Sequence, residues 1–111
     1  MGSRGYQAIS IVGGSHNVVR GVRALANNTD AAITIKSSQF SEVSNCDIGG
    51  TAESPIFGRC LWTLNATRAL IHDNKVHHCT NHALDLDVNT TKSAVWNNIC
   101  EDNTQEGIYI E

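Results

Sequence analysis

The sequence repeats itself about every 24 residues, and this period limits the folds open to the chain more than any single motif does. Ala8-Ile9-Ser10-Ile11 recurs 24 positions later as Ala32-Ile33-Thr34-Ile35, and Ala83-Leu84-Asp85-Leu86 recurs in the same way as Gly107-Ile108-Tyr109-Ile110. Cys60-Leu61-Trp62-Thr63-Leu64 lies between these pairs, after a slightly longer interval. Repeats of roughly 20–50 residues are typical of solenoids, in which successive units stack on one another and bury one continuous core.

Each repeat contains two short stretches in which apolar and polar residues alternate, and polar turn residues separate them. The first stretches are the segments just quoted, and the second are Val19–Ala24, Val43–Ile48, Ile71–Val76 and Val95–Cys100. Strict alternation with β-branched residues predicts strands that bury one face. No helical periodicity is sustained along the chain, so the sequence predicts an all-β protein.

The second stretches align in columns, which indicates how the strands pair. Val19, Val43, Ile71 and Val95 fall on one column at intervals of 24, 28 and 24 residues, and an insertion at 51–58 explains the longer interval. Strands so far apart, with neither helices nor two-residue hairpin turns between them, pair by stacking in parallel about 4.8 Å apart. The predicted fold is a right-handed parallel β-helix of about four to five coils, the hand following the general preference of crossover connections.

The segments 43–48, 71–76 and 95–100, followed by 107–111, resemble the right-handed parallel β-helix repeats of the pectin-lyase-like superfamily. The resemblance covers nearly the whole chain. It implies the fold, whereas activities in that family range from polysaccharide lyases, hydrolases and C5-epimerases to phage tailspikes and noncatalytic surface proteins. The family's inward asparagine ladder is matched by Asn74 and Asn98, while Val22 and Cys46 depart from it. We therefore expect a short ladder.

Residues 1–111 have the length of a single domain. The alternation already runs at Ile9 and still runs at Ile110, and neither end shows the polar cap that a solenoid needs. We therefore expect a fragment of a longer solenoid, or a building block for one. Unpaired strand edges favour self-association through the uncapped ends.

Charge and composition argue against some classes of binding partner. A net charge of -3 without a basic run argues against nucleic acid, and no apolar run is long enough for a membrane span. Asn27, Asn65 and Asn89 head N-x-Ser/Thr sequons, which fit an extracellular or cell-surface protein.

The state of the four cysteines, Cys46, Cys60, Cys79 and Cys100, stays open. No two of them occupy neighbouring coils of one column, which favours small buried apolar residues. At least one disulfide, most plausibly with the turn residue Cys79, is the alternative.

The first stretches also predict an outer face that could carry chemistry. With Ile35, Trp62, Leu86 and Ile110 aligned as an inward column, the outward columns are Lys36, Thr63, Asp87 and Glu111, and beside them Thr34, Leu61, Asp85 and Tyr109. Asp87 and Glu111 would lie one coil apart, about 4.8 Å. Like charges so close disfavour joint ionisation, so such a pair serves as general acid or base or binds a cation. Solvated surface carboxylates are the plainer alternative.

The candidate catalytic residues are therefore Asp85, Asp87 and Glu111, and the same three are the candidate ligands of a weak Ca²⁺ site, the one cofactor that the sequence suggests. In the resembled lyases and epimerases the sugar chain lies along this face. The candidate ligand-binding residues are Lys36, Thr63, Tyr109 and Trp96. Trp96 aligns with outward positions and could stack on a sugar ring, whereas Trp62 is expected in the core.

His77-His78-Cys79-Thr80-Asn81-His82 forms a second cluster of chemically active side chains. Three or four of these side chains could hold Zn²⁺, although their spacing matches no zinc signature. Packing of the rings over neighbouring coils is the favoured interpretation, and His82 acting as a base near Asp85 is the alternative.

Three classes of function fit these patterns. The favoured one combines two of them: a noncatalytic β-helix surface or structural module that binds poly- or oligosaccharide and stacks end to end. The alternative is a fragment of a polysaccharide-active enzyme, a lyase, hydrolase or C5-epimerase acting on acidic glycans. Lys36 is the one basic residue in the predicted outward column, and the coils are few for an enzyme of this kind. Whether the chain is an enzyme is left open.

Overall fold

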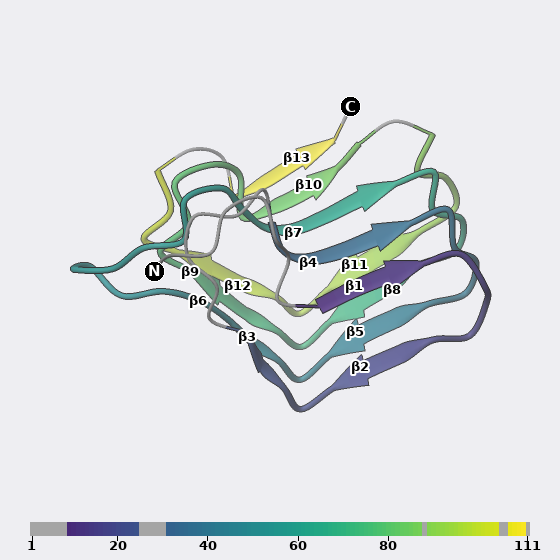
Figure 1. Cartoon of the computed structure of the whole chain (residues 1–111), viewed down its shortest axis with the longest axis horizontal. Coiled ribbons are helices and arrows are strands. Elements are labelled where there is room, and N and C mark those ends of the chain that lie inside the picture. Colours follow the sequence, from purple (N-terminus) through teal and green to yellow (C-terminus); the bar gives the residue numbers. More distant parts are fainter. Residues whose placement is uncertain (1–8, 25–30, 88, 105–106, 111) are drawn as a thin grey trace.

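A computed structural model of the chain describes residues 9–24, 31–87, 89–104 and 107–110. These residues form three parallel sheets that wind around one axis (Figure 1). The first sheet has the order β1 (Ile9–Val12), β4 (Ala31–Lys36), β7 (Arg59–Leu64), β10 (Leu84–Leu86) and β13 (Ile108–Ile110). The second sheet contains β2 (Val18–Arg20), β5 (Glu42–Ser44), β8 (Leu70–His72) and β11 (Ala94–Trp96), and the third β3 (Arg23–Ala24), β6 (Asp47–Gly49), β9 (Lys75–His77) and β12 (Ile99–Glu101).

Every paired strand is parallel to its neighbour in the next coil, as the repeat predicts. The predicted parallel β-helix is therefore confirmed. The part of the chain that the structure describes has no helix that could cross a membrane.

Each second stretch of the repeat is two short strands rather than one. Gly21, Asn45, Asp73 and Asn97 occupy the same turn between the second and third sheets, with φ of 67°, 53°, 57° and 54°. A residue in the left-handed region breaks the extended chain and redirects it, so each stretch contributes to two sheets. Glycine and the short polar residues Asn and Asp tolerate this conformation best, which explains their place in the repeat.

The core fills the space between the three sheets. At each inward-facing strand position, the apolar side chains of successive coils stack into a column. Val19, Val43, Ile71 and Val95 stack in the second sheet, as the sequence predicts. Ala24, Ile48, Val76 and Cys100 stack in the same way in the third sheet. Ile33, Ile35, Leu61 and Leu84 of the first sheet are fully buried and belong to the same core.

The register predicted for β7 is wrong by one residue. Thr63, and not Trp62, pairs with Ile35 and Leu86, while Trp62 pairs with Thr34 and Asp85. A shift of one residue exchanges the two faces of a strand. Trp62, expected in the core, therefore lies on the outer face, and Leu61 and Thr63, expected outside, are buried. Inside, the Thr63 hydroxyl lies 2.8 Å from the Thr90 hydroxyl.

The short asparagine ladder is confirmed. Asn74 donates through Nδ2 to Asn98 Oδ1 at 2.9 Å and to the carbonyl of Val43 at 3.1 Å, and its Oδ1 accepts from the backbone N–H of Cys46 at 3.0 Å. Asn98 in turn donates to the carbonyl of Ile71. These amides satisfy backbone groups at the turn where the chain leaves the second sheet, so the ladder joins three coils.

The disulfide alternative holds for one pair of cysteines. Cys60 at the start of β7 is bonded to Cys79, with 5.7 Å between their Cα atoms, and the bond ties the end of the inserted loop to the following coil. Cys46 and Cys100 are free thiols. Burial raises the pKa of Cys100.

Candidate functional site

The outer face of the first sheet gathers aromatic and charged side chains from β7, from β13, and from β10 and the residues on either side of it. We call Arg59, Trp62, His82, Asp85, Asp87 and Tyr109 the outer-face cluster. Pairing in register places Trp62 beside Asp85 and Asp85 beside Tyr109 on successive strands. The cluster therefore lies across neighbouring coils at about 4.8 Å per coil.

Arg59 holds the carboxylate at the centre of the cluster. Its Nε donates to Asp85 Oδ2 at 2.5 Å, and its guanidinium lies 4.2 Å from the centre of the Trp62 ring. The Asp85 side chain is 3% exposed. A buried carboxylate needs a cationic partner, and Arg supplies a planar one that also stacks on an aromatic face. Asp85 Oδ1 is buried without a hydrogen-bond partner among the described residues.

The remaining members extend the cluster on both sides of Asp85. Trp62 Nε1 donates to Asp87 Oδ2 at 3.1 Å. The His82 imidazole is stacked on the Tyr109 ring, with centroids 4.3 Å apart and 4° between the planes. The rings of Trp62 and Tyr109 thus flank the two carboxylates. Asp85 accepts a hydrogen bond from Arg59, and Asp87 accepts one from Trp62.

Three of the predicted site residues, Asp85, Asp87 and Tyr109, are brought together here. Lys36 is exposed at the end of β4. Thr63 was predicted to bind a ligand from the outer face but is fully buried in the core. Trp96 lies on the outer face of the second sheet, away from this cluster.

Glu111 lies outside the described residues, so its pairing with Asp87 and the proposed Ca²⁺ ligation stay predictions. Among the described residues, no three His, Cys, Asp or Glu side chains form a group that could hold a metal ion. The role of His82 as a base also stays a prediction.

Arg59 is not identified as a site residue by the sequence pattern. It precedes Trp62 by three residues, and only the correct register of β7 places both of them beside Asp85.

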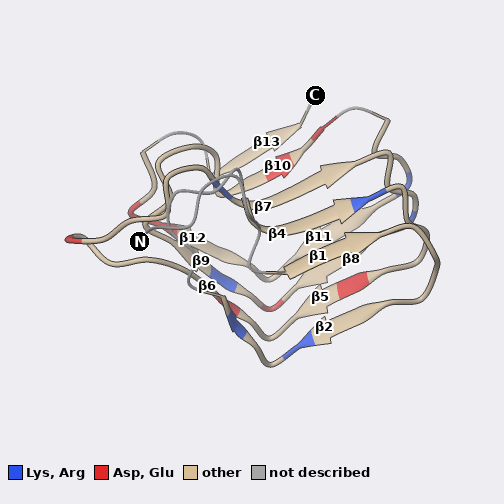
Figure 2. Cartoon of the chain, viewed as in Figure 1, with Lys and Arg blue, Asp and Glu red and all other residues tan. Residues whose placement is uncertain are grey.

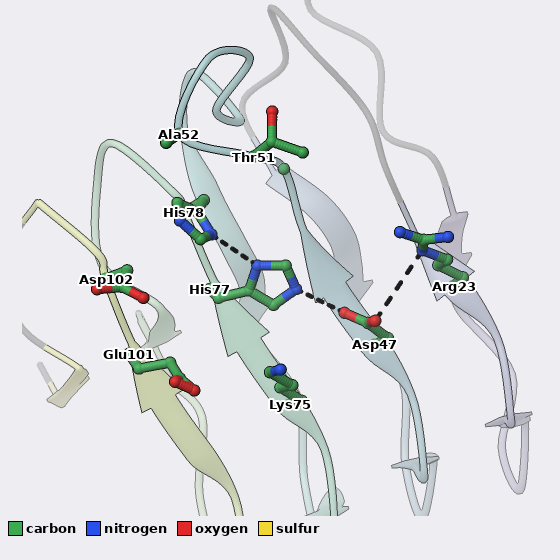
Figure 3. Close-up of a pocket in the computed structure, with 10 residues that line it drawn as sticks. Arg23, Asp47, Thr51, Ala52, Lys75, His77, His78, Glu101 and Asp102 are labelled. Carbon is green, nitrogen blue, oxygen red and sulfur yellow. Dashed lines mark hydrogen bonds and ion pairs between the residues drawn. The ribbon is translucent and has the colours of Figure 1, made fainter.

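The third sheet carries a groove of about 340 Å³ on its outer face (Figure 3). Arg23, Asp47 and Lys75 form one outward column of its floor, and His77 and Glu101 contribute to the next. Thr51 and Ala52 of the inserted loop lie near the two imidazoles. His77 Nε2 is 2.6 Å from Asp47 Oδ1, and its Nδ1 is 2.8 Å from Nδ1 of His78.

The Asp47 carboxylate fixes the direction of one of the two hydrogen bonds of His77. A carboxylate only accepts, so Nε2 of His77 is the donor to Asp47. When both rings are neutral, Nδ1 of His77 accepts from Nδ1 of His78, and Nε2 of His78 keeps its lone pair. The sequence favours ring packing for these histidines. It could not place Asp47, which is 30 residues from His77, beside them.

On the outer face of the second sheet, the imidazole of His72 lies between the carboxylates of Glu42 and Asp73. His72 Nε2 lies 2.5 Å from Glu42 Oε2, and its Nδ1 lies 2.6 Å from Asp73 Oδ2. Hydrogen bonds to Asp73 and Glu42 raise the pKa of His72 above its usual 6.5. The hydrogen bond from His72, aided by Arg20, lowers the pKa of Glu42 below 4.5.

Comparison with known proteins bears on the fold that carries these faces. The family model described as the right-handed beta helix region matches residues 2–111. The chain belongs to this right-handed β-helix family. No curated protein and no solved structure shows significant similarity to it. Membership establishes the architecture and its hand, and the function has to be argued from the faces themselves.

Proposed function

We propose that this β-helix is a noncatalytic surface module that binds an oligo- or polysaccharide across the outer-face cluster. The observation that carries the proposal is the placement of Trp62 and Tyr109 on either side of the Arg59–Asp85 pair. Aromatic rings provide apolar faces for the C–H side of a sugar, and fixed charged groups orient its hydroxyls. The parallel strands align the cluster along the solenoid, which suits an extended chain.

The hydrogen bonding of the two carboxylates supports binding rather than turnover. Asp85 accepts from Arg59, and Asp87 accepts from Trp62. Groups held in this way are preorganised acceptors, and ordering them costs little when a ligand arrives. A general acid would instead need a proton to give to the leaving oxygen.

The two tryptophans allow a direct test, because the chain contains no others. In a Trp96→Phe variant, Trp62 is the single indole, and its fluorescence should change when uronic-acid or neutral gluco-oligosaccharides are titrated in. The matched Trp62→Phe variant, which keeps Trp96, should show no fluorescence change and no calorimetric binding of the neutral oligosaccharides.

A response confined to Trp96 would move the binding site to the second sheet and contradict the proposal. Release of new reducing ends or of unsaturated uronides on prolonged incubation would favour the polysaccharide-active enzyme instead.

End-on stacking is the second part of the proposed role. β13 forms an edge of the first sheet, and its Ile108 and Ile110 are 47% and 72% exposed. Ile99, on the edge strand β12, is 59% exposed. Parallel edge strands with exposed apolar side chains pair readily with another solenoid end. Sedimentation velocity should show concentration-dependent association that an Ile108→Lys/Ile110→Lys variant abolishes; a monomer at all concentrations would refute it.

An extracellular or cell-surface location is supported by two features. The Cys60–Cys79 disulfide is typical of an oxidising compartment, and the sequon residues Asn65 and Asn89 are exposed at turns. Alkylation of the denatured protein, isolated from its own cells under acid quench, should modify two thiols, those of Cys46 and Cys100. Four modified thiols would argue for a reducing compartment.

A further inference from the structure

The turns that follow the first sheet stack one side chain per coil into a ridge. His16, Phe40, Arg68 and Lys92 occupy the same position in four successive coils, with φ of 59°, 55°, 57° and 54°. The residues that directly precede them are aligned in the same way. Isolated parallel bridges join Ser15 to Gln39, Gln39 to Thr67, and Thr67 to Thr91. Because equal backbone conformations direct side chains alike, the four form one exposed row, which we call the cationic ridge.

Three of the four members of the ridge, His16, Phe40 and Arg68, are packed against each other. The His16 ring is stacked on Phe40, with centroids 5.0 Å apart and 5° between the planes. The guanidinium of Arg68 lies 5.5 Å from the centre of the Phe40 ring. These contacts limit the freedom of the side chains, so less conformational entropy is lost when a partner binds.

The charge of the ridge is not neutralised by its surroundings. The turn segments 13–17, 37–41, 65–69 and 89–93 contain no Asp or Glu, although the chain has a net charge of -3. Figure 2 shows Lys and Arg in the turns at the right-hand edge of the molecule. Arg20, Arg23 and Arg59 are each paired with a carboxylate. Arg68 and Lys92, by contrast, have no carboxylate within salt-bridge distance among the described residues.

Polar side chains suited to sugar hydroxyls flank the ridge. Gln39 and Thr91 are exposed in the neighbouring column. Asn65 and Asn89 are exposed two positions earlier in the same turns, where Asn89 Nδ2 donates to Asn65 Oδ1 at 3.0 Å. Amides and hydroxyls both donate and accept, as the hydroxyls of a saccharide require.

We propose that the cationic ridge is a binding surface for an anionic saccharide chain, whose carboxylate or sulfate groups contact Arg68 and Lys92. The chain would run along the solenoid axis, since the cations follow one another about one coil, 4.8 Å, apart. Single-stranded nucleic acid fits less well, because it needs open aromatic faces and both faces of Phe40 are approached by His16 and Arg68. The surface is separate from the outer-face cluster, so this proposal does not rest on the proposed function.

The test compares two double variants that remove the same charge from different faces. Arg68→Gln/Lys92→Gln should weaken binding of heparin and oligogalacturonate fragments about tenfold or more at low salt, because each contact is charge-assisted. Arg23→Gln/Lys75→Gln on the third sheet should leave the affinity within about twofold. Raising the salt concentration should weaken wild-type binding more steeply than binding by the ridge variant.

Each other outcome overturns the proposal. Equal losses in both double variants would indicate a response to net charge alone, and absence of binding at low salt would remove the surface altogether. Tighter binding of a single-stranded oligonucleotide would assign the ridge to nucleic acid. The proposed function is tested independently, since the Trp62 fluorescence response to neutral oligosaccharides should persist in Arg68→Gln/Lys92→Gln.

Discussion

The imidazole of His72 lies parallel to the indole of Trp96, with ring centroids 4.2 Å apart and 2° between their planes. Glu42 and Asp73 each accept a hydrogen bond from one nitrogen of the same ring. Carboxylates only accept, so both hydrogen bonds require the imidazolium form of His72, which its raised pKa favours. Glu42, His72 and Trp96 belong to three successive coils, so this cation links the coils along the axis.

Stability should fall as the pH rises through the folded pKa of His72. The folded state raises the pKa of His72 above 6.5. Its contribution is therefore fully present below the unfolded pKa and is lost as the pH rises through the folded pKa. Thermal melting followed by circular dichroism should show a decrease over this interval, and His72→Gln should flatten it. His16→Gln, at an exposed histidine, should leave the decrease intact; an unchanged profile in His72→Gln would contradict the assignment.

The acidic limit should depend on Glu42. Its folded pKa is lowered below 4.5, so its contribution is present above the unfolded pKa and is lost as the pH falls through the folded pKa. Glu42→Gln should therefore lose stability near neutral pH and show a weaker further decrease on acidification. Urea titrations at a series of pH values measure both effects. Equal acid sensitivity of the variant and the wild type would assign the acid transition to other carboxylates.

The repeat predicted the fold because the period and the inward columns of the second and third sheets are written directly in the sequence. The repeat did not predict the register of β7, because both faces of this strand carry apolar residues. Cys60, Trp62 and Leu64 form the more hydrophobic set, yet Leu61 and Thr63 face the core. The insertion before β7 lengthens the interval between repeats, so the spacing alone does not give the register. The partners that accommodate Trp62 outside, Arg59 and Asp87, are identified only by contacts in space.

Substitutions at neighbouring positions should confirm this register. Leu61→Asp should abolish folding, because an unpaired carboxylate in the core costs several kcal/mol, of the order of the whole stability of a small domain, ~5 kcal/mol. Trp62→Gln, one residue away on the outer face, should fold. Soluble expression and the β-type circular dichroism spectrum distinguish the two variants. A folded Leu61→Asp together with an unfolded Trp62→Gln would restore the register expected from hydrophobicity.

Only part of the candidate site can be predicted from the sequence, for a related reason. Asp85 and Tyr109 lie one period apart, so their proximity follows from the repeat. Asp47 and His77, or Glu42 and His72, combine a strand register with a side-chain offset across an insertion. Such pairs depend on rotamers and on the length of the inserted loop, neither of which periodicity encodes.

Removal of the disulfide should destabilise the fold without changing it. Cys60 and Cys79 are 19 residues apart, and closing a loop of this size restricts the unfolded chain by about 3 kcal/mol. Cys60→Ala/Cys79→Ala should lower the free energy of unfolding by roughly that amount in urea, and the wild type under reducing conditions should match it. Cys46→Ala serves as the control for loss of a buried thiol. A double variant as stable as the oxidised protein would contradict the expected entropic gain.

The asparagine ladder should contribute most at its buried centre. Asn74 is 2% exposed and satisfies the backbone N–H of Cys46 and the carbonyl of Val43. Asn74→Ala leaves both groups buried without partners, at a cost of about 1–3 kcal/mol for each. Asn98→Ala removes similar bonds at a half-exposed position, where water can replace the amide, so its loss should be smaller. Urea unfolding of the two variants measures the difference, and hydrogen exchange of the Cys46 amide should accelerate only in Asn74→Ala. Equal losses in both variants would mean that burial does not set the strength of the ladder.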